Sequence, residues 1–155
     1  MKYFMIGLLK IGDKAPDFKG TNQNGEIISL ADLKGKKVVL YFYPKDNTPG
    51  CTAEACNLKD NYERFKSKGY EIIGVSADNE KSHKKFSDKY NLPFNIIADI
   101  DKSIIKSYNV WGKKSMYGKE YEGINRTTYI ISEKGIIEDI ITKVDTKNHT
   151  FQIIK

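Results

Sequence analysis

The sequence has few cysteines and no long apolar run, and each shortage excludes a class of protein. Only two cysteines, Cys51 and Cys56, occur in 155 residues, too few for a secreted fold built on disulfide bonds. We therefore expect a reducing, cytoplasmic compartment, in which a reversible thiol pair can operate. The apolar run from Tyr3 to Leu9 is short and ends at Lys10, so it predicts neither a signal peptide nor a membrane span.

Arginine is also scarce, although the formal net charge is +6. A positive charge of this size makes nucleic acid a partner to be considered. Of the 26 basic residues, however, only Arg64 and Arg126 are arginine, whereas phosphate and base recognition favours the bidentate guanidinium. The lysines are interleaved with acids, as at Lys59-Asp60. A solvated lysine-rich surface is the better interpretation, and a nucleic-acid-binding or chaperone-like module rests on charge alone.

No repeat, low-complexity tract or linker divides the chain, so we expect one domain over residues 1–155. The apolar run 38–43 is rich in β-branched and aromatic residues, which predicts a strand buried on both faces. Further strands are expected at 71–75, 94–98, 127–131 and 136–141, with helices at 49–67, 79–90, 103–108 and in the last residues, and an early hairpin or turn at 24–25. This order predicts an α/β sandwich with a mostly parallel centre, an antiparallel edge and right-handed crossovers.

Cys51 lies where the strand 38–43 gives way to the helix that follows. Pro44 ends the strand, Thr48 is well placed as the helix N-cap, and Pro49 suits the first helical position. A thiol in the first helical turn faces unpaired backbone N–H groups and the positive end of the helix dipole, which favour a thiolate. Cys51 is therefore the candidate nucleophile.

The second cysteine lies on a different face of the same predicted helix. An apolar stripe places Cys51 on the inward face and leaves Cys56 off it. In an intact helix the five-residue spacing separates the two Cα atoms by about 8.6 Å, whereas a disulfide needs roughly 4.4–6.8 Å. If the two thiols pair, the first turns of the helix must unwind.

Pro44, Thr48 and Cys51 reproduce the pattern P-x-x-x-T-x-x-C, and residues 43–56 as a whole resemble peroxiredoxins of the Q type, also called bacterioferritin comigratory proteins. The resemblance covers roughly residues 10–145. It implies a thioredoxin-like α/β fold with a central mixed sheet flanked by helices on both faces. It also implies a thiol-dependent peroxidase that reduces hydrogen peroxide and organic hydroperoxides.

The resemblance further implies a role for each site residue. Cys51 is expected to be the peroxidatic nucleophile, with the Thr48 hydroxyl and the Cys51 backbone N–H holding the peroxide. Pro44 is expected to shield the pocket, and Arg126 to stabilise the thiolate and the transition state. Glu54 matches the position that orients this arginine. On residue patterns alone, an arginine beside a strand is an ordinary surface residue.

Cys56 matches the resolving cysteine of family members that form a disulfide within one chain. The implied partners are a peroxide and thioredoxin or a similar dithiol donor, with a monomer expected and a dimer left open. A dithiol oxidoreductase acting on other proteins is the alternative, but such enzymes carry C-x-x-C, and here four residues separate the thiols.

The remaining candidates are assigned structural roles. No metal or cofactor is expected, because two cysteines and two scattered histidines are poorly spaced for a zinc site. His83 is expected to pack inside the fold and His149 to lie in the tail without chemical function. Core or loop packing is expected for Trp111, Tyr117 and Tyr121, although a pocket or interface is possible. The segment after Val144 is shorter and more polar than the helix usual there.

Overall fold

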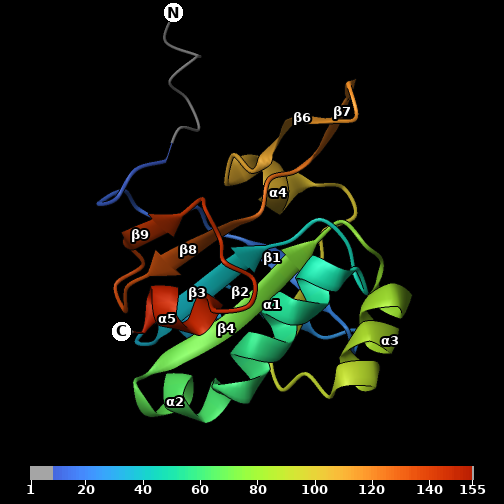
Figure 1. Ribbon diagram of the computed structural model, residues 1–155. Helices are drawn as coiled ribbons and strands as arrows, with labels where there is room; N and C mark the ends of the chain where they lie inside the picture. Colours follow the sequence, from blue (N-terminus) through green and yellow to red (C-terminus); the bar gives the residue numbers. More distant parts are fainter. Residues whose placement is uncertain (1–8, 155) are drawn as a thin grey trace, which may run out of the picture.

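A seven-stranded mixed sheet organises the structure, which is a computed structural model describing residues 9–154 (Figure 1). Most of the apolar run that begins at Tyr3 therefore lies outside the described residues. The strands follow the order β2-β1-β5-β4-β3-β8-β9. They are β1 (Lys19–Asn22), β2 (Ile27–Ser29), β3 (Lys37–Phe42), β4 (Tyr70–Ser76), β5 (Asn95–Ala98), β8 (Thr127–Ile131) and β9 (Ile137–Ile141).

The centre of this sheet is parallel and both of its sides are antiparallel. Strand β4 pairs in parallel with β3 and β5, whereas β8 and β9 on one side and β1 and β2 on the other pair antiparallel. The last five residues of β3 are buried, because this strand is central and covered on both faces. The predicted parallel centre is confirmed, and an antiparallel edge occurs twice rather than once.

Helices cover both faces of the sheet, as expected. Helices α1 (Pro49–Asp60), α2 (Tyr62–Ser67), α3 (Glu80–Tyr90) and α5 (His149–Ile153) lie over one face, and α4 (Ser103–Ser107) and the short η2 (Ala31–Leu33) belong to the other (Figure 1). Alternate β3 residues serve the two layers: Val39 and Tyr41 pack with α1, and Leu40 and Phe42 with α4.

The single helix predicted over 49–67 is wrong in one respect, because it breaks at Asn61. The side chain of Asn61 donates a hydrogen bond to the backbone oxygen of Asn57 at 2.9 Å. The backbone N–H of Asn61 donates instead to the backbone oxygens of Leu58 and Lys59. An asparagine side chain that competes for a helical carbonyl in this way favours a helix end. The break at Asn61 separates α1 from α2, and α2 packs against β4.

A hairpin of β6 (Trp111–Met116) and β7 (Lys119–Ile124) projects from the sheet and was not predicted (Figure 1). Tyr117 and Gly118 make its turn, both with positive φ. The packing expected for Trp111 is confirmed, since it lies against the core. The same expectation is wrong for Tyr117, which is 97% exposed.

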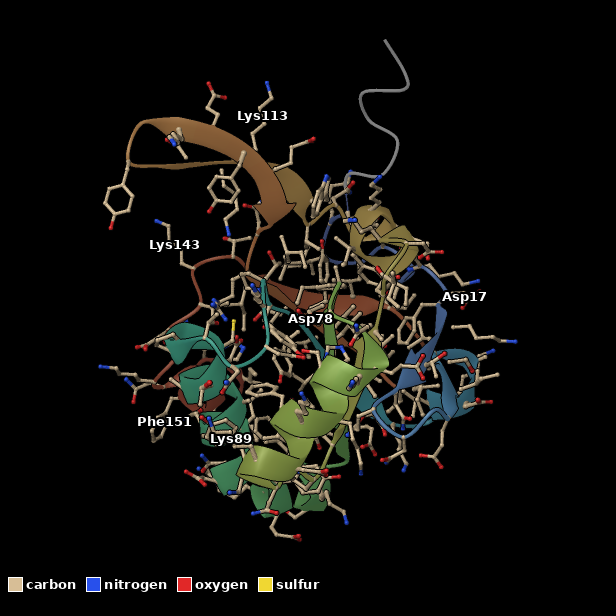
Figure 2. All side chains as sticks on the ribbon, turned by 90° about the vertical axis from the view of Figure 1, so that its right-hand side faces the viewer. Asp17, Asp78, Lys89, Lys113, Lys143 and Phe151 are labelled. Atoms are coloured by element: carbon tan, nitrogen blue, oxygen red, sulfur yellow. The ribbon has the colours of Figure 1, made fainter. Side chains whose placement is uncertain are left out.

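The lysines are distributed over the outside of the molecule. Figure 2 shows Lys89, Lys113 and Lys143 extending from three different parts of the chain, and all three are exposed. Within residues 9–154, no helix is both long enough and apolar enough to cross a membrane.

Gly74 in β4 is required by close packing beneath the helices. A Cβ at this position would lie 2.8 Å from Ile96 Cγ2 and 2.9 Å from Tyr41 Cζ. We expect Gly74→Ala to lower the free energy of unfolding by about 1–3 kcal/mol, because a tight core resists added volume. Urea denaturation measures the loss, and Ser67→Ala on the exposed side of α2 is the control. Equal stability of the two variants would contradict the packing argument.

Candidate active site

Cys51 lies in the first turn of α1, directly beyond the carboxyl end of β3. Thr48 occupies the predicted N-cap position and Pro49 the first helical position. The Thr48 side chain makes no capping hydrogen bond to α1; its hydroxyl instead donates to the Lys45 backbone oxygen at 2.9 Å. Thr48 thus closes the loop before α1. The Cys51 side chain is buried on the inward face of the helix, as the stripe predicted.

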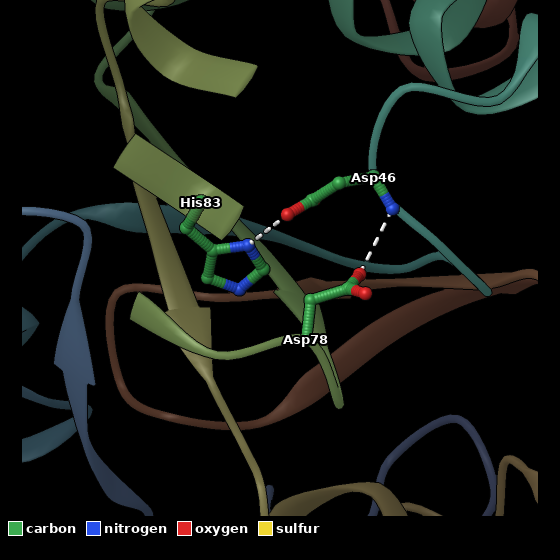
Figure 3. Close-up of side chains that lie close together, drawn as sticks. All are labelled: Asp46, Asp78 and His83. Atoms are coloured by element: carbon green, nitrogen blue, oxygen red, sulfur yellow. Dashed lines mark hydrogen bonds and ion pairs between the residues drawn. The ribbon is translucent and has the colours of Figure 1, made fainter. Parts of the chain in front are cut away.

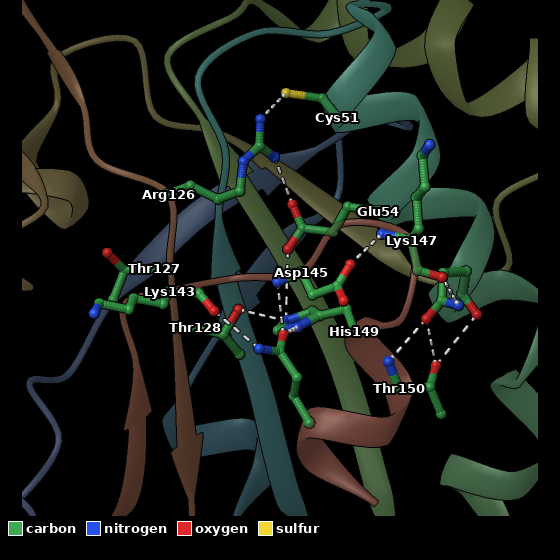
Figure 4. A network of polar contacts seen from close by, with 12 residues as sticks. Cys51, Glu54, Arg126, Thr127, Thr128, Lys143, Asp145, Lys147, His149 and Thr150 are labelled. Carbon is green, nitrogen blue, oxygen red and sulfur yellow. Dashed lines mark hydrogen bonds and ion pairs between the residues drawn. The ribbon is translucent and has the colours of Figure 1, made fainter.

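The pairing of β3 with β8 brings Arg126 to this thiol. Phe42 at the end of β3 is opposite Thr127 at the start of β8. Arg126 directly precedes Thr127 and therefore lies at the end of the sheet where α1 begins. Its Nη2 lies 3.3 Å from Cys51 Sγ, and its Nη1 donates to Glu54 Oε1 at 2.7 Å (Figure 4). Burial opposes the charge on Arg126, but Cys51 and Glu54 outweigh it and raise the pKa of the guanidinium.

Glu54 is on the same face of α1 as Cys51, three residues further along, and is completely buried. Burial raises the pKa of its carboxyl to about 7, although the charge and the hydrogen bond of Arg126 act in the opposite direction. Among the described residues its second oxygen, Oε2, has no hydrogen-bond partner. The neighbouring atom is Nε2 of His149, 3.5 Å away.

His149 was expected to lie in the tail without chemical function, and its expected position is wrong. His149 begins α5 and is completely buried. Its Nε2 is 2.8 Å from the Thr128 hydroxyl, and its Nδ1 is 2.7 Å from Gln152 Oε1. The sequence carries no signal for this position, because nothing local links a residue near the C-terminus to α1.

Cys56 lies apart from Cys51, on a partly exposed face of α1, and both thiols are free. Burial raises the pKa of the Cys56 thiol. The adjacent Asn57 binds the C-terminal segment: its amide donates to Lys147 O at 2.9 Å, and its oxygen accepts from the N–H and hydroxyl of Thr150 at 2.8 and 2.7 Å. We call these contacts of Asn57 the α1–α5 clasp.

A cavity of about 330 Å³ lies between the loop after β3 and the β6–β7 hairpin. Pro44 forms one wall, and Trp111 and Tyr121 contribute aromatic surface. Lys114 also lines it, and its ammonium donates to the Ile124 backbone oxygen at 2.8 Å. Burial lowers the pKa of Lys114, with a further contribution from Arg126. The cavity therefore combines apolar walls with lysine side chains, and Glu122 adds one carboxylate.

A buried polar cluster fixes the loop that precedes Cys51 (Figure 3). Asp46 accepts hydrogen bonds from Tyr43 and His83 at 2.6 and 2.7 Å, and its N–H donates to Asp78 at 2.8 Å. The other nitrogen of His83 is 2.9 Å from the Ile97 backbone oxygen. The packed role predicted for His83 is confirmed. Asp46, Asp78 and His83 lie close enough to share a cation. Both ring nitrogens of His83, however, are already hydrogen-bonded to oxygen atoms of the protein.

The geometry suits attack by sulfur on an electrophile. A guanidinium beside the sulfur stabilises a thiolate and any negative charge that develops on an atom bound next to it. Unpaired backbone N–H groups of the first turn of α1 also stabilise negative charge at this position. Cys51, Glu54 and Arg126 are thus gathered at one place, with Thr48 at the start of the same helix, Pro44 in the preceding loop and Cys56 held apart.

Comparisons with known proteins give a consistent result. Residues 11–140 match the model of the AhpC/TSA family. The chain is 44% identical to a putative peroxiredoxin Bcp of Coxiella burnetii, over 94% of this chain and 97% of the relative. It is also 44% identical to peroxiredoxin Bcp of Bacillus subtilis, over 95% and 94%. Peroxiredoxin Q of Xanthomonas campestris has a similar structure, with a TM-score of 0.83 at 34% identity, covering 88% of this chain and 86% of that one.

The contact between Arg126 and Cys51 can be tested by thiol alkylation. Arg126→Lys keeps a positive charge but cannot reach Sγ and Glu54 together. A hydrogen bond to a charged group contributes about 1.5–3 kcal/mol, so we expect iodoacetamide to alkylate Cys51 roughly 10- to 100-fold more slowly. Peptide mass spectrometry measures the rate. Arg64→Lys, at the other arginine of the chain, is the matched control, and equal rates in the two variants would refute the contact.

Proposed function

The chain belongs to the AhpC/TSA family and is a thiol-dependent peroxidase, and from this premise we propose that Cys51 is its peroxidatic cysteine. The observation that carries the assignment is the Arg126 guanidinium 3.3 Å from Cys51 Sγ. For Cys56, the other cysteine, the charge of Lys59 favours the thiolate, but burial outweighs it and raises the pKa. Of the two sulfurs, Cys51 is therefore the better nucleophile.

In the proposed reaction the Cys51 thiolate attacks one oxygen of a hydroperoxide. A sulfur–oxygen bond forms, the oxygen–oxygen bond breaks, and its electron pair leaves on the far oxygen, which takes up a proton to give water or an alcohol. Arg126 stabilises the thiolate and the departing charge. The Thr48 hydroxyl and the Cys51 N–H hold the peroxide, Pro44 shields the pocket, and Glu54 orients the guanidinium.

The resulting sulfenic acid is then resolved by Cys56. The Cys56 thiol attacks the sulfur of Cys51, a disulfide forms and water leaves. A thiol reductant regenerates the enzyme, and we propose thioredoxin or a similar dithiol donor in a cytoplasmic compartment. Because both thiols belong to one helix of one chain, a monomer is sufficient for the cycle.

The cycle predicts different failures for the two cysteine variants. In an assay coupled to thioredoxin, Cys51→Ser should abolish peroxide consumption, because no nucleophile remains. Cys56→Ser should consume one equivalent and then stop, because its sulfenic acid cannot be resolved. Each variant serves as the other's control. Continued turnover by Cys51→Ser would overturn the assignment.

The intramolecular disulfide also predicts a change in structure after oxidation. Pairing requires α1 to unwind around Asn57, which breaks the α1–α5 clasp. Amide hydrogen exchange should therefore become faster in residues 51–57 and also in residues 145–153, while α3 serves as the unchanged reference. Mass spectrometry of reduced and peroxide-treated protein measures this. Unaltered protection in both segments would contradict the unwinding.

A further inference from the structure

The buried carboxyl of Glu54 uses only one of its two oxygens. Oε1 accepts from Arg126, whereas Oε2 has no hydrogen-bond partner among the described residues and faces His149 Nε2 at 3.5 Å (Figure 4). Leaving a charged oxygen unpaired in a buried site is costly. This pair of atoms therefore needs a physical explanation.

The surroundings of His149 define which of its nitrogens carries hydrogen. The amide of Gln152 is oriented by two backbone groups: its nitrogen donates to Lys143 O at 2.9 Å, and its oxygen accepts from Asp145 N–H at 2.9 Å. That same oxygen faces His149 Nδ1 at 2.7 Å. Since the oxygen can only accept, Nδ1 must be the donor. In a neutral ring Nε2 is then an acceptor, and it receives the Thr128 hydroxyl.

Without a further proton, two acceptors therefore face each other in the interior. A proton on Glu54 Oε2 can be donated to His149, and a proton on His149 Nε2 can be donated to Glu54. Either placement removes the conflict and leaves Oε1 available to Arg126. We propose that Glu54 and His149 share one proton while Cys51 is a thiolate, and that they release it when Cys51 is oxidised.

The electrostatics of the site agree with this geometry. Burial raises the pKa of Glu54 to about 7, and burial together with Arg126 lowers that of His149 despite the Gln152 hydrogen bond, so both shifts favour Glu54 as the holder of the proton. Burial holds the pKa of Tyr41 on β3 well above its usual value, so its hydroxyl stays neutral. The other charges that act on the network are Arg126, Cys51, Asp145 before α5 and Lys114 on β6.

The release follows from charge balance around Arg126. While Cys51 is a thiolate it partly neutralises the guanidinium, and its negative charge raises the proton affinity of the pair. Sulfenic acid is neutral, so Arg126 then favours an ionised Glu54. The thiolate and a hydroperoxide, with one proton on the pair, give sulfenic acid, an alcohol or water, and an unprotonated pair. No net proton is exchanged with the solution.

This makes His149 a positioning residue: it holds Glu54, which orients Arg126 against the sulfur. The inference rests on the proposed role of Cys51 in peroxide reduction. Its test counts protons, whereas sulfenic acid is detected separately by dimedone labelling. Failure of the shared proton is therefore distinguishable from failure of the peroxidase assignment.

The experiment uses the full chain with Cys56→Ser, which stops the reaction at the sulfenic acid. Reduced protein in weakly buffered solution below about pH 7, where the pair holds its proton, receives one equivalent of hydrogen peroxide, and a pH indicator reports proton uptake. We expect uptake near zero in this background. Adding Glu54→Gln should raise uptake toward one proton per sulfenic acid, because the departing oxygen must then take its proton from solution.

Thr150→Val is the matched control, because it removes the hydroxyl contact to Asn57 next to His149, while the Thr150 N–H still bonds Asn57 and the side chains of Glu54 and His149 are retained. It should keep uptake near zero. Histidine-selective nitrogen NMR of the chain carrying only Cys56→Ser, which leaves His149 intact, gives a second readout: the His149 signal should shift on oxidation, while His83 stays unchanged. Equal proton uptake with and without Glu54→Gln, or an unmoved His149 signal, would overturn the proposal.

Discussion

The guanidinium of Arg126 is the interaction on which the candidate site depends, because it contacts the sulfur of Cys51 and the carboxylate of Glu54 at once. A buried ion pair is weak evidence for stability, since the cost of removing charges from water offsets much of their attraction. A site that retains such a pair beside a free thiol is better explained by chemistry than by folding. Both partners of Arg126 come from one face of α1, so any change in that helix is felt at the guanidinium.

Helix α1 meets two opposing requirements. While it is folded, it holds Cys51 and Glu54 beside Arg126 and keeps Cys56 on another face. Formation of the proposed disulfide requires the same turns to unwind. The α1–α5 clasp lies at this point, since Asn57 follows Cys56 directly and binds the segment that also places His149 against Glu54. The C-terminal segment therefore supports the reduced geometry through two neighbouring contacts.

Much of the architecture follows from local patterns. The buried strand at 38–43, the strand–helix alternation and the C-terminal hairpin were predicted because apolar periodicity is strong there. The β6–β7 hairpin was missed because its strands are largely polar and pack on little besides each other. The break at Asn61 was missed because it depends on one side-chain hydrogen bond to Asn57, which no apolar pattern reveals.

The sequence by itself determined the position of Cys51 at the start of a helix, its inward orientation and the separation of Cys56, because helix geometry fixes these over a few residues. The resemblance in the Pro44–Cys56 segment identified the chemistry. Only the tertiary structure decided which distant groups surround the thiol. Arg126 reaches it through the pairing of β3 with β8, and His149 reaches Glu54 through the docking of α5 on α1, across 75 and 95 residues of chain respectively. Contacts at such separations depend on how whole elements pack, and short-range sequence patterns do not encode that packing.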